Sequence, residues 1–348
     1  MRLLYLPNSY SQQRQFQKKA NIYPVLMAME AQKYRNEGHE VYWNINRCPK
    51  CKRKYTIKTW FTLLKHPAVL QCSKCKWEFD LNEFDKIITE PEGLSFLSLP
   101  HPDRVFTGAK EYTSGNYKYL PGTHMQVANG CWWGKCSFCV ENGKPYEVRS
   151  VDDVIEEIKE IKQLGFKEVF DDSGTFPTGQ WLLDFCNLLN DINFSCNMRL
   201  VDNDYKKMKQ VGFRMLLFGI ESANQNTLDK INKGVKVDDI IPTIRKAAEA
   251  GLEPHISCIF GWEWETEKEA LNTLRLVWWL LRKGYAKTAQ ASFIVQQGIK
   301  GNESQRHFIN DIYGVWKYPD FWFSQLKDIK DKDDLKYLWR KIKAGLNV

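Results

Sequence analysis

The sequence lacks an apolar run long enough to cross a membrane, and it lacks the pattern of a secretory signal. The longest apolar run in its expected helical regions covers residues 276–281, far short of the roughly 20 residues that a bilayer requires. At the N-terminus, only a few apolar side chains precede Pro7 and Asn8, which is too short for a signal peptide. We therefore expect a cytoplasmic protein with no membrane contact.

A cytoplasmic chain also lacks the oxidising surroundings that disulfides need, so its ten cysteines require another explanation. Seven of them are clustered, and clustered thiols in a reducing compartment are typical of metal ligands. The clustered set is Cys48, Cys51, Cys72, Cys75, Cys131, Cys136 and Cys139. The isolated Cys186, Cys196 and Cys258 are expected to be core residues, because free cysteine is often buried.

Acidic residues are absent from residues 47–76, where nine lysines and arginines occur. The net charge of +8 therefore belongs to this segment, and the rest of the chain is close to neutral. The composition is otherwise that of a globular protein, with 43% hydrophobic and 26% charged residues. A chain of 348 residues is long enough to bury a substantial core.

The N-terminal part is predicted to begin an open α/β sheet. Arg2–Leu6 is a short apolar run, Tyr23–Arg35 has helical spacing, and Val41–Trp43 supplies the β-branched and aromatic residues of a strand. A further strand is expected at Phe84–Thr89, after the basic segment. The pattern is therefore strand, helix, strand, interruption and strand.

From residue 125 onward, amphipathic helices that end at a glycine alternate with short strands. The glycines are Gly165, Gly212, Gly251 and Gly284. The expected strands are Met125–Ala128, Glu168–Phe170, Phe194–Leu200, Met215–Phe218, Ile256–Phe260 and Ala291–Val295. Such alternation implies parallel strands with right-handed crossovers. Six units are too few for a closed eight-stranded barrel and predict an open, partial (β/α)6 barrel, with its chemistry at the carboxyl ends of the strands.

A cysteine-rich loop follows the first of these strands, and from Asn129 to Cys139 it reads NGCWWGKCSFC. Three thiolates on so short a loop can hold one face of a cubane iron–sulfur cluster, and the lack of a fourth thiolate nearby leaves one iron open to a small molecule. Gly130 and Gly134 would let the backbone approach the cluster closely. The alternative is a zinc knuckle completed by a distant Cys or His.

This loop and the strands that follow it resemble the radical S-adenosylmethionine (radical SAM) superfamily over residues 125–295, and in particular its cobalamin-associated and methylthiotransferase-like branch. One departure is that four residues separate Cys131 from Cys136, where the family usually has three. The resemblance implies that Cys131, Cys136 and Cys139 hold a 4Fe-4S cluster whose open iron binds SAM. It also implies reductive cleavage of SAM to methionine and a 5′-deoxyadenosyl radical that abstracts hydrogen from the substrate, with an electron donor such as flavodoxin or ferredoxin.

The resemblance further implies cofactor contacts after the later strands. They are Phe138 (adenine), Asp172 and Ser173 (methionine amino group), Arg199 (carboxylate), Glu221 and Ser222 (ribose hydroxyls) and Gly261 (a turn where relatives have Gly-Pro-Gly-Glu-Thr). Two of these assignments have a purely structural alternative. Asp171 and Asp172 could form a helix cap, and Arg199 could form a surface salt bridge. Trp262 and Trp264 depart from the family pattern and would shape a different pocket.

Two Cys-x-x-Cys pairs interrupt the N-terminal sheet. Cys48 and Cys51, then Cys72 and Cys75, are separated by twenty residues, which is typical of a four-thiolate zinc ribbon. Redox-active cysteines or a second cluster are the alternatives. The nine cations, interleaved with aromatic residues, favour a surface that binds a phosphate backbone and stacks on bases. The alternative to such a binding surface is a solvated structural knuckle that braces the barrel mouth.

The predicted organisation is therefore α/β with four parts. Residues 1–46 and 78–124 form a remnant Rossmann-like domain and linker, 47–77 the zinc ribbon, 125–295 the radical SAM partial barrel, and 296–348 a C-terminal helical extension. The N-terminal segment resembles the ends of a cobalamin-binding domain. Its middle is missing, so we do not expect it to enclose a corrinoid.

The predicted function is radical SAM modification of a C–H position in a nucleic acid or nucleotide, with base alkylation as the expected reaction and residues 47–76 as the binding surface. Modification of a peptide or small metabolite is the second enzymatic interpretation. A non-catalytic nucleic-acid-binding protein with structural zinc and iron–sulfur sites is the interpretation from another class. Asp172, Arg199 and Glu221 at strand ends argue against the last, because a structural cluster needs no cofactor contacts.

Overall fold

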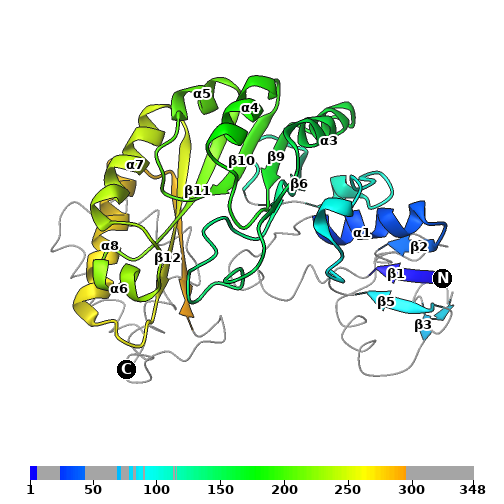
Figure 1. The fold of residues 1–348 in the computed structure, drawn as a ribbon, viewed down its shortest axis with the longest axis horizontal. Coiled ribbons are helices and arrows are strands. Elements are labelled where there is room, and N and C mark those ends of the chain that lie inside the picture. Colours follow the sequence, from blue (N-terminus) through cyan, green and yellow to red (C-terminus); the bar gives the residue numbers. More distant parts are fainter. Residues whose placement is uncertain are drawn as a thin grey trace. The chain divides into compact units, whose positions relative to one another are not determined.

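The computed structural model describes residues 1–5, 24–43, 69–71, 78–80, 84–88, 91–112, 114 and 116–294. The described residues up to Ser114 form one compact unit, and those from Asn116 onward form a second (Figure 1). The four predicted zinc ligands and the predicted extension at 296–348 lie outside the described residues. In the part of the chain that is described, no helix is long and apolar enough to cross a membrane.

The first unit contains a three-stranded parallel sheet with the order β2-β1-β5. The strands are β1 (Arg2–Tyr5), β2 (Glu40–Trp43) and β5 (Lys86–Ile88), and helix α1 (Val25–Asn36) connects the first two. Leu3 of the central strand is level with Val41 on one side and Lys86 on the other. The strand, helix, strand and later strand expected from the sequence are thus confirmed.

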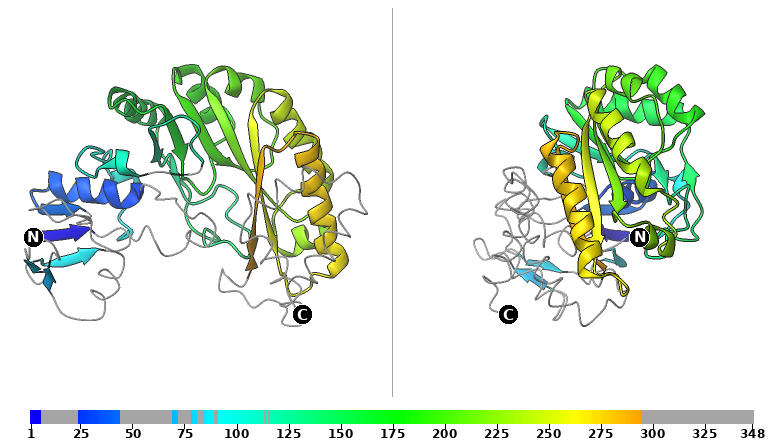
Figure 2. Two further views of the ribbon diagram at one scale, coloured as in Figure 1. Left: turned by 180° about the vertical axis from the view of Figure 1, so that it is seen from behind. Right: turned by 90° about the vertical axis from the view of Figure 1, so that its left-hand side faces the viewer.

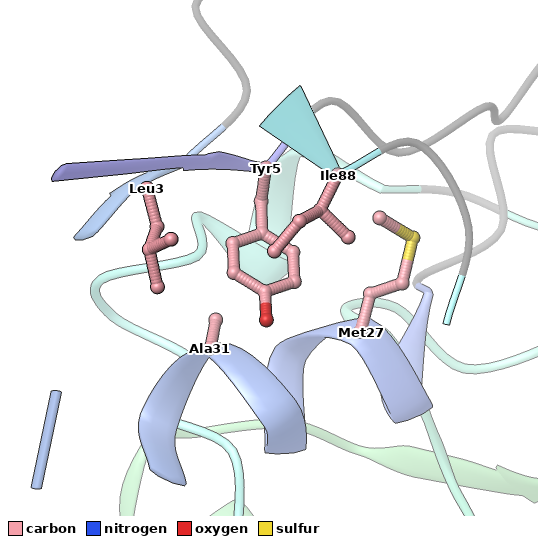
Figure 3. Packing of buried hydrophobic residues seen from close by; sticks show 5 residues of the cluster. All are labelled: Leu3, Tyr5, Met27, Ala31 and Ile88. Atoms are coloured by element: carbon pink, nitrogen blue, oxygen red, sulfur yellow. The ribbon is translucent and has the colours of Figure 1, made fainter. Parts of the chain in front are cut away.

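The core of this unit lies between its sheet and α1. Leu3, Tyr5 and Ile88 project from the sheet towards Met27 and Ala31 of the helix (Figure 3). Helix α1 is also anchored by a polar contact, because both carboxylate oxygens of the buried Glu30 accept the backbone N–H of Glu92 at 3.0 Å.

The remaining elements of the first unit are short. They are the antiparallel strands β3 (Val69–Gln71) and β4 (Glu78–Asp80) and the 3-10 turns η3 (Phe96–Ser98) and η4 (Ala109–Glu111). Leu70 is level with Phe79, so β3 and β4 bracket the Cys72–Cys75 pair in the sequence.

The second unit contains a six-stranded, all-parallel sheet with the order β13-β12-β11-β10-β9-β6. The strands are β6 (Gly122–Met125), β9 (Glu168–Asp171), β10 (Asn193–Met198), β11 (Phe213–Glu221), β12 (Glu253–Phe260) and β13 (Thr288–Phe293). Each strand pairs with the next long strand of the chain. The sheet is curved and open (Figures 1 and 2), as expected of a partial barrel.

Helices cover the outer face of this sheet (Figure 2). They are α3 (Val151–Gln163), α4 (Gln180–Leu188), α5 (Tyr205–Gln210), α6 (Gln225–Lys230), α7 (Val237–Glu249) and α8 (Glu267–Arg282). Ser150 caps α3 by accepting the backbone N–H of Asp153, as the sequence predicts. A glycine with positive φ follows each of four helices, at Gly165, Gly212, Gly251 and Gly284. This confirms the predicted helix ends.

The amino-terminal edge of the sheet is held by a buried ion-pair network. Arg214 of β11 donates to Glu168 of β9 and to Glu253 of β12, the latter at 2.7 Å. The second carboxylate oxygen of Glu168 accepts the backbone N–H groups of Lys118 and Tyr119 at 2.7 and 2.9 Å. Because the network joins three strands and the segment before β6, it fixes the base on which the opposite edge is built.

Candidate iron–sulfur and cofactor site

The three predicted cluster ligands lie on one loop at the carboxyl edge of the sheet. By carboxyl edge we mean the carboxyl ends of the parallel strands together with the loops that follow them. The loop runs from β7 (Ala128–Asn129) to β8 (Glu147–Val148), and these two short strands pair antiparallel and close its base. Cys136 is buried, whereas Cys131 and Cys139 are partly exposed. We call residues 130–146 the cysteine loop.

Two glycines give the cysteine loop its tight path. Gly130 has φ +85°, and a Cβ there would lie 2.3 Å from the carbonyl oxygen of Pro145. Gly134 has φ +56°, and a Cβ there would lie 3.2 Å from the carbonyl oxygen of Cys131. Both positions therefore require glycine, because the loop packs against its own backbone.

The donor set fits an iron–sulfur cluster. Burial raises the pKa of the Cys136 and Cys139 thiols, and the charges of Lys233 and Arg199 act in the opposite direction on Cys136. These two cations are placed to offset the negative charge of a thiolate-bound cluster. Among the described residues, no group of three Cys, His, Asp or Glu side chains is arranged to hold a single metal ion. Thiolates are the ligands that hold iron–sulfur clusters in proteins, and the cysteine loop offers three.

The segment after β9 contains both buried and exposed side chains. The buried Asp171 accepts hydrogen bonds from the backbone of Val127 (2.8 Å) and from the Ser173 hydroxyl (2.7 Å), and that hydroxyl accepts the N–H of Ala128 at 2.8 Å. We call Asp171 and Ser173 the strand clasp, because they hold the chain that enters the cysteine loop. Asp172 is exposed. The N-cap of the next helix is Gly179, so the helix-cap alternative for the aspartates is wrong.

Arg199 is buried beyond the end of β10, so the surface salt bridge weighed as its alternative is wrong. Its guanidinium lies 5.2 and 4.7 Å from the ring centroids of Trp132 and Trp133 in the cysteine loop. Nη2 donates to the carbonyl oxygen of Lys233 at 2.5 Å, while Nε is buried and has no hydrogen-bond partner among the described residues. The structure thus brings Arg199 to the cysteine loop.

Glu221 and Ser222 lie at the end of β11, which is longer than the sequence predicts. Glu221 is the last residue of β11, with φ +56° beside a register shift against β12. Its carboxylate lies 2.7 Å from the ammonium of Lys233, and both groups are buried. The buried Ser222 hydroxyl accepts the backbone N–H of Asn224 at 3.2 Å.

Lys233 is a site residue that the sequence analysis missed. Its carbonyl contacts Arg199, its ammonium contacts Glu221, and its charge acts on Cys136 and Cys139. Its position in the sequence carries no signal that distinguishes it from a surface lysine.

The turn after β12 brings Phe138 and Gly261 into the same region. Phe138 packs edge-on against Trp262 at 5.5 Å between ring centroids, and Trp262 stacks on Trp264 at 5.7 Å. Gly261, with φ +88°, donates its N–H to Glu265 at 2.7 Å. Burial raises the pKa of Glu265 to about 8.

An open parallel α/β barrel with a three-cysteine loop at its carboxyl edge is the architecture expected of a radical SAM domain. Residues 125–277 match the family model of the radical SAM superfamily. The chain therefore carries a radical SAM domain over these residues. The predicted resemblance and the partial-barrel fold are both confirmed.

Curated relatives match over the same part of the chain. The uncharacterized methyltransferase PH0819 of Pyrococcus horikoshii is 29% identical over 169 residues, which are 45% of this chain and 36% of that protein. The bacteriochlorophyllide d C-8(2)-methyltransferase of Chlorobaculum tepidum is 29% identical over 167 residues, 41% of this chain and 36% of that protein. The chain thus spans only about a third of the length of these relatives.

Solved structures show weaker likenesses. The radical SAM methyltransferase TsrM of Kitasatospora setae, with cobalamin and a 4Fe-4S cluster bound, is 18% identical with a TM-score of 0.42, over 49% of this chain and 34% of that chain. The cobalamin-dependent SAM radical enzyme OxsB is 14% identical with a TM-score of 0.44, over 73% of this chain and 38% of that chain.

Proposed function

We propose that this protein is a radical SAM enzyme that transfers a methyl or alkyl group, with a 4Fe-4S cluster on Cys131, Cys136 and Cys139. The observation that carries the proposal is the placement of three thiols on one loop, beside Arg199 and Glu221, at the carboxyl edge of a parallel sheet. The names of the curated relatives support methyl transfer. The cluster, when bound, supplies the electron that cleaves SAM.

The chain's own residues would bind and orient the cofactor. The unpaired Nε of Arg199 can donate to the carboxylate of SAM, and the exposed Asp172 can accept from its amino group. Glu221, paired with Lys233, is an acceptor for ribose hydroxyls. Phe138 and Trp262 offer apolar ring surface for the adenine. We propose Ser173 and Ser222 as supporting residues of this site, because both hydroxyls bond to backbone.

The test is anaerobic reconstitution with iron and sulfide, followed by SAM and reduced flavodoxin or ferredoxin, without added cobalamin. We expect 5′-deoxyadenosine if the chemistry is radical abstraction and S-adenosylhomocysteine if a methyl group is transferred. An Asp172→Asn variant should bind the same amount of iron but bind SAM more weakly. A reconstituted protein that neither binds nor cleaves SAM with any donor would contradict the proposal.

For the substrate, we propose a nucleic acid or nucleotide that is modified by base alkylation. The support is the nine cations and no acids of residues 47–76, since a phosphate backbone would offset their mutual repulsion. Replacing Lys50, Lys52, Arg53 and Lys54 by Ala should weaken binding to RNA or DNA and flatten its salt dependence, with SAM binding unchanged. If the wild-type protein binds no nucleic acid in a salt-dependent way, a peptide or small metabolite becomes the leading candidate.

We also propose a zinc ion on Cys48, Cys51, Cys72 and Cys75. The support is the spacing of the two Cys-x-x-Cys pairs, together with the antiparallel β3 and β4 on either side of the second pair. The purified protein should carry about one zinc per chain that persists when the iron–sulfur cluster is lost. Cys48→Ser should remove it, and unchanged zinc content in that variant would refute this assignment.

A further inference from the structure

One short turn accepts hydrogen bonds from three residues of the site. Residues 231–234, which we call the anchor turn, follow α6 and present three consecutive backbone carbonyls. The bonds run from Ser137 N to Ile231 O (3.0 Å), from Trp133 Nε1 to Asn232 O (2.8 Å) and from Arg199 Nη2 to Lys233 O (2.5 Å). Two of the donors belong to the cysteine loop, and the third is the predicted carboxylate-binding arginine.

The backbone of the anchor turn explains why three carbonyls can face the site. Asn232 and Gly234 have φ of +53° and +64°, so the chain reverses within two residues. The backbone N–H groups of Asn232 and Lys233 bond back to α6, to Asp229 and Leu228 at 2.9 Å. The turn is therefore fixed from behind, and its carbonyls are left to bind the cysteine loop and Arg199.

Trp133 contacts the anchor turn with its ring as well as its N–H. A Cβ added to Gly234 would lie 2.2 Å from the indole of Trp133, so that ring rests directly on the glycine backbone. The Arg199 guanidinium lies over the same ring, 4.7 Å from its centroid. Trp133 belongs to the stretch between Cys131 and Cys136 that is one residue longer than the usual family spacing.

The same turn also contacts the end of the neighbouring strand β11. The ammonium of Lys233 lies 2.7 Å from the Glu221 carboxylate, and both groups are buried. Lys233 thereby contacts Arg199 from β10 with its carbonyl and Glu221 from β11 with its side chain. Five contacts thus converge on four consecutive residues: three to the cysteine loop, including the Trp133 ring on Gly234, and two to predicted cofactor-binding residues.

We propose that the anchor turn is a positioning element that sets the cysteine loop and the cofactor-binding side chains Arg199 and Glu221 as one unit, with Trp133 on Gly234 as its main contact to the loop. This inference rests on the proposed function, because it assigns the turn a role towards the cluster and SAM. A site that binds both groups needs them fixed relative to one another within a fraction of an ångström. A turn bonded to both sides provides that constraint.

The first experiment separates the Trp133 contact from general backbone strain. Gly234→Ala should lower the iron bound after reconstitution several-fold, because its Cβ displaces the Trp133 ring. Gly165→Ala is the matched control, since Gly165 also has positive φ (+81°) but no atom lies within 4 Å of its added Cβ. This control should bind as much iron as the wild type, even if both variants melt at a lower temperature.

A double-variant cycle then tests whether the two residues act together. Trp133→Leu removes the ring on which the new methyl group would collide, so Gly234→Ala should cause little further loss of iron in that background. Independent effects would instead multiply, because contributions of residues that do not interact add as free energies. Multiplied losses, or wild-type iron content in Gly234→Ala, would overturn the proposal.

The second experiment addresses the cofactor side. Lys233→Met keeps the carbonyl that binds Arg199 but removes the pair with Glu221. We expect a smaller loss of iron than in Gly234→Ala, because only one of the two cations near the thiols is removed, together with roughly tenfold weaker SAM binding and a smaller SAM-induced change in the electron paramagnetic resonance spectrum of the reduced cluster. A Lys233→Met protein with the wild-type SAM response would refute the coupling. If the wild-type protein itself forms no cluster, the proposed function is wrong. If the wild-type protein forms the cluster and the anchor-turn variants bind iron and SAM as it does, only the role proposed for the anchor turn is wrong.

Discussion

Buried polar groups are hydrogen-bonded at the amino-terminal edge of the six-stranded sheet, whereas several at the carboxyl edge have atoms without a partner among the described residues. At the amino-terminal edge, Arg214, Glu168 and Glu253 bond to one another and to backbone groups. In the described part of the second unit, six buried side-chain atoms have no hydrogen-bond partner, and five belong to the cysteine loop or the carboxyl edge. They are on Trp132, Asp171, Thr175, Arg199 and Glu265, with His255 of β12 as the exception.

This contrast separates stability from function within one sheet. An unpaired buried polar atom costs roughly 1–3 kcal/mol, so a fold retains such atoms where they serve something other than stability. In (β/α) barrels the amino-terminal face supports the fold and the carboxyl face carries the chemistry. The predictions that follow test this division, starting with the largest expected effect.

The cysteine loop should respond completely to the loss of one ligand. Cys131→Ala, Cys136→Ala or Cys139→Ala should abolish cluster assembly, because the loop offers three thiolates and the cluster needs all of them as ligands. Iron content and visible absorbance after anaerobic reconstitution measure the effect. Cys186→Ala, at a buried cysteine of α4, is the control and should retain the cluster. A triple variant that still bound its full iron would remove the basis of the assignment.

Breaking the amino-terminal network should cost much stability without affecting cluster assembly. Arg214→Met leaves Glu168 buried without its ion-pair partner, and loss of one member of a buried pair typically costs about 3–5 kcal/mol. Chemical denaturation of the reconstituted protein gives the value. Lys246→Met, which breaks an exposed pair with Asp202, is the matched control and should cost about 1 kcal/mol or less. Equal effects of the two variants would show that the network is not special.

The buried Glu265 should make stability depend on pH. Its pKa of about 8 lies above the ordinary carboxyl value of 4.5, so between these pH values the unfolded chain ionises it while the folded chain keeps the proton. Stability should therefore fall as pH rises towards 8, by up to about 1.4 kcal/mol per pH unit. Melting temperatures of wild type and Glu265→Gln between pH 5 and 9 test this. Parallel pH profiles for the two proteins would refute it.

The smallest expected effect concerns the helix that begins beside Glu265. Thr266 caps α8 in a reciprocal arrangement with Glu269. Thr266→Ala should cost about 1 kcal/mol, as is usual for loss of such a cap, and Thr266→Ser should recover most of it. Denaturation midpoints measure both. SAM binding should be unchanged in the alanine variant, because the cap contributes to stability and not to the cofactor site. Loss of SAM binding would contradict the separation of stability from function that we infer.

The sequence predicted the elements whose signals are local. Glycines after helices, the Ser150 cap and the short apolar strands gave the six-stranded parallel sheet, and the cysteine spacing gave the loop at its first strand. These features depend on residues a few positions apart, which a single sequence displays directly.

The contacts that shape the site could not be predicted in this way. β11 continues to Glu221 because its register shifts against β12 near Gly219, and a shift between two strands is invisible in either strand alone. Lys233 is paired with Glu221, twelve residues away, and lies beside Arg199, thirty-four residues away. Trp133 meets Gly234 across about a hundred residues. Such pairings follow from the topology, which brings the strand ends together.

The order of the strands also bears on how the second unit assembles. Since every long strand pairs with the one that follows it in the chain, each added helix–strand unit completes a single new interface. Contacts close in sequence favour rapid folding, so the sheet can grow from one side to the other by successive addition. β6 stands at one end of this row and has β9 as its only neighbour among the described strands. The cysteine loop thus leaves the sheet from an end strand, and the strand clasp of Asp171 and Ser173 links its entry to the second strand of the row.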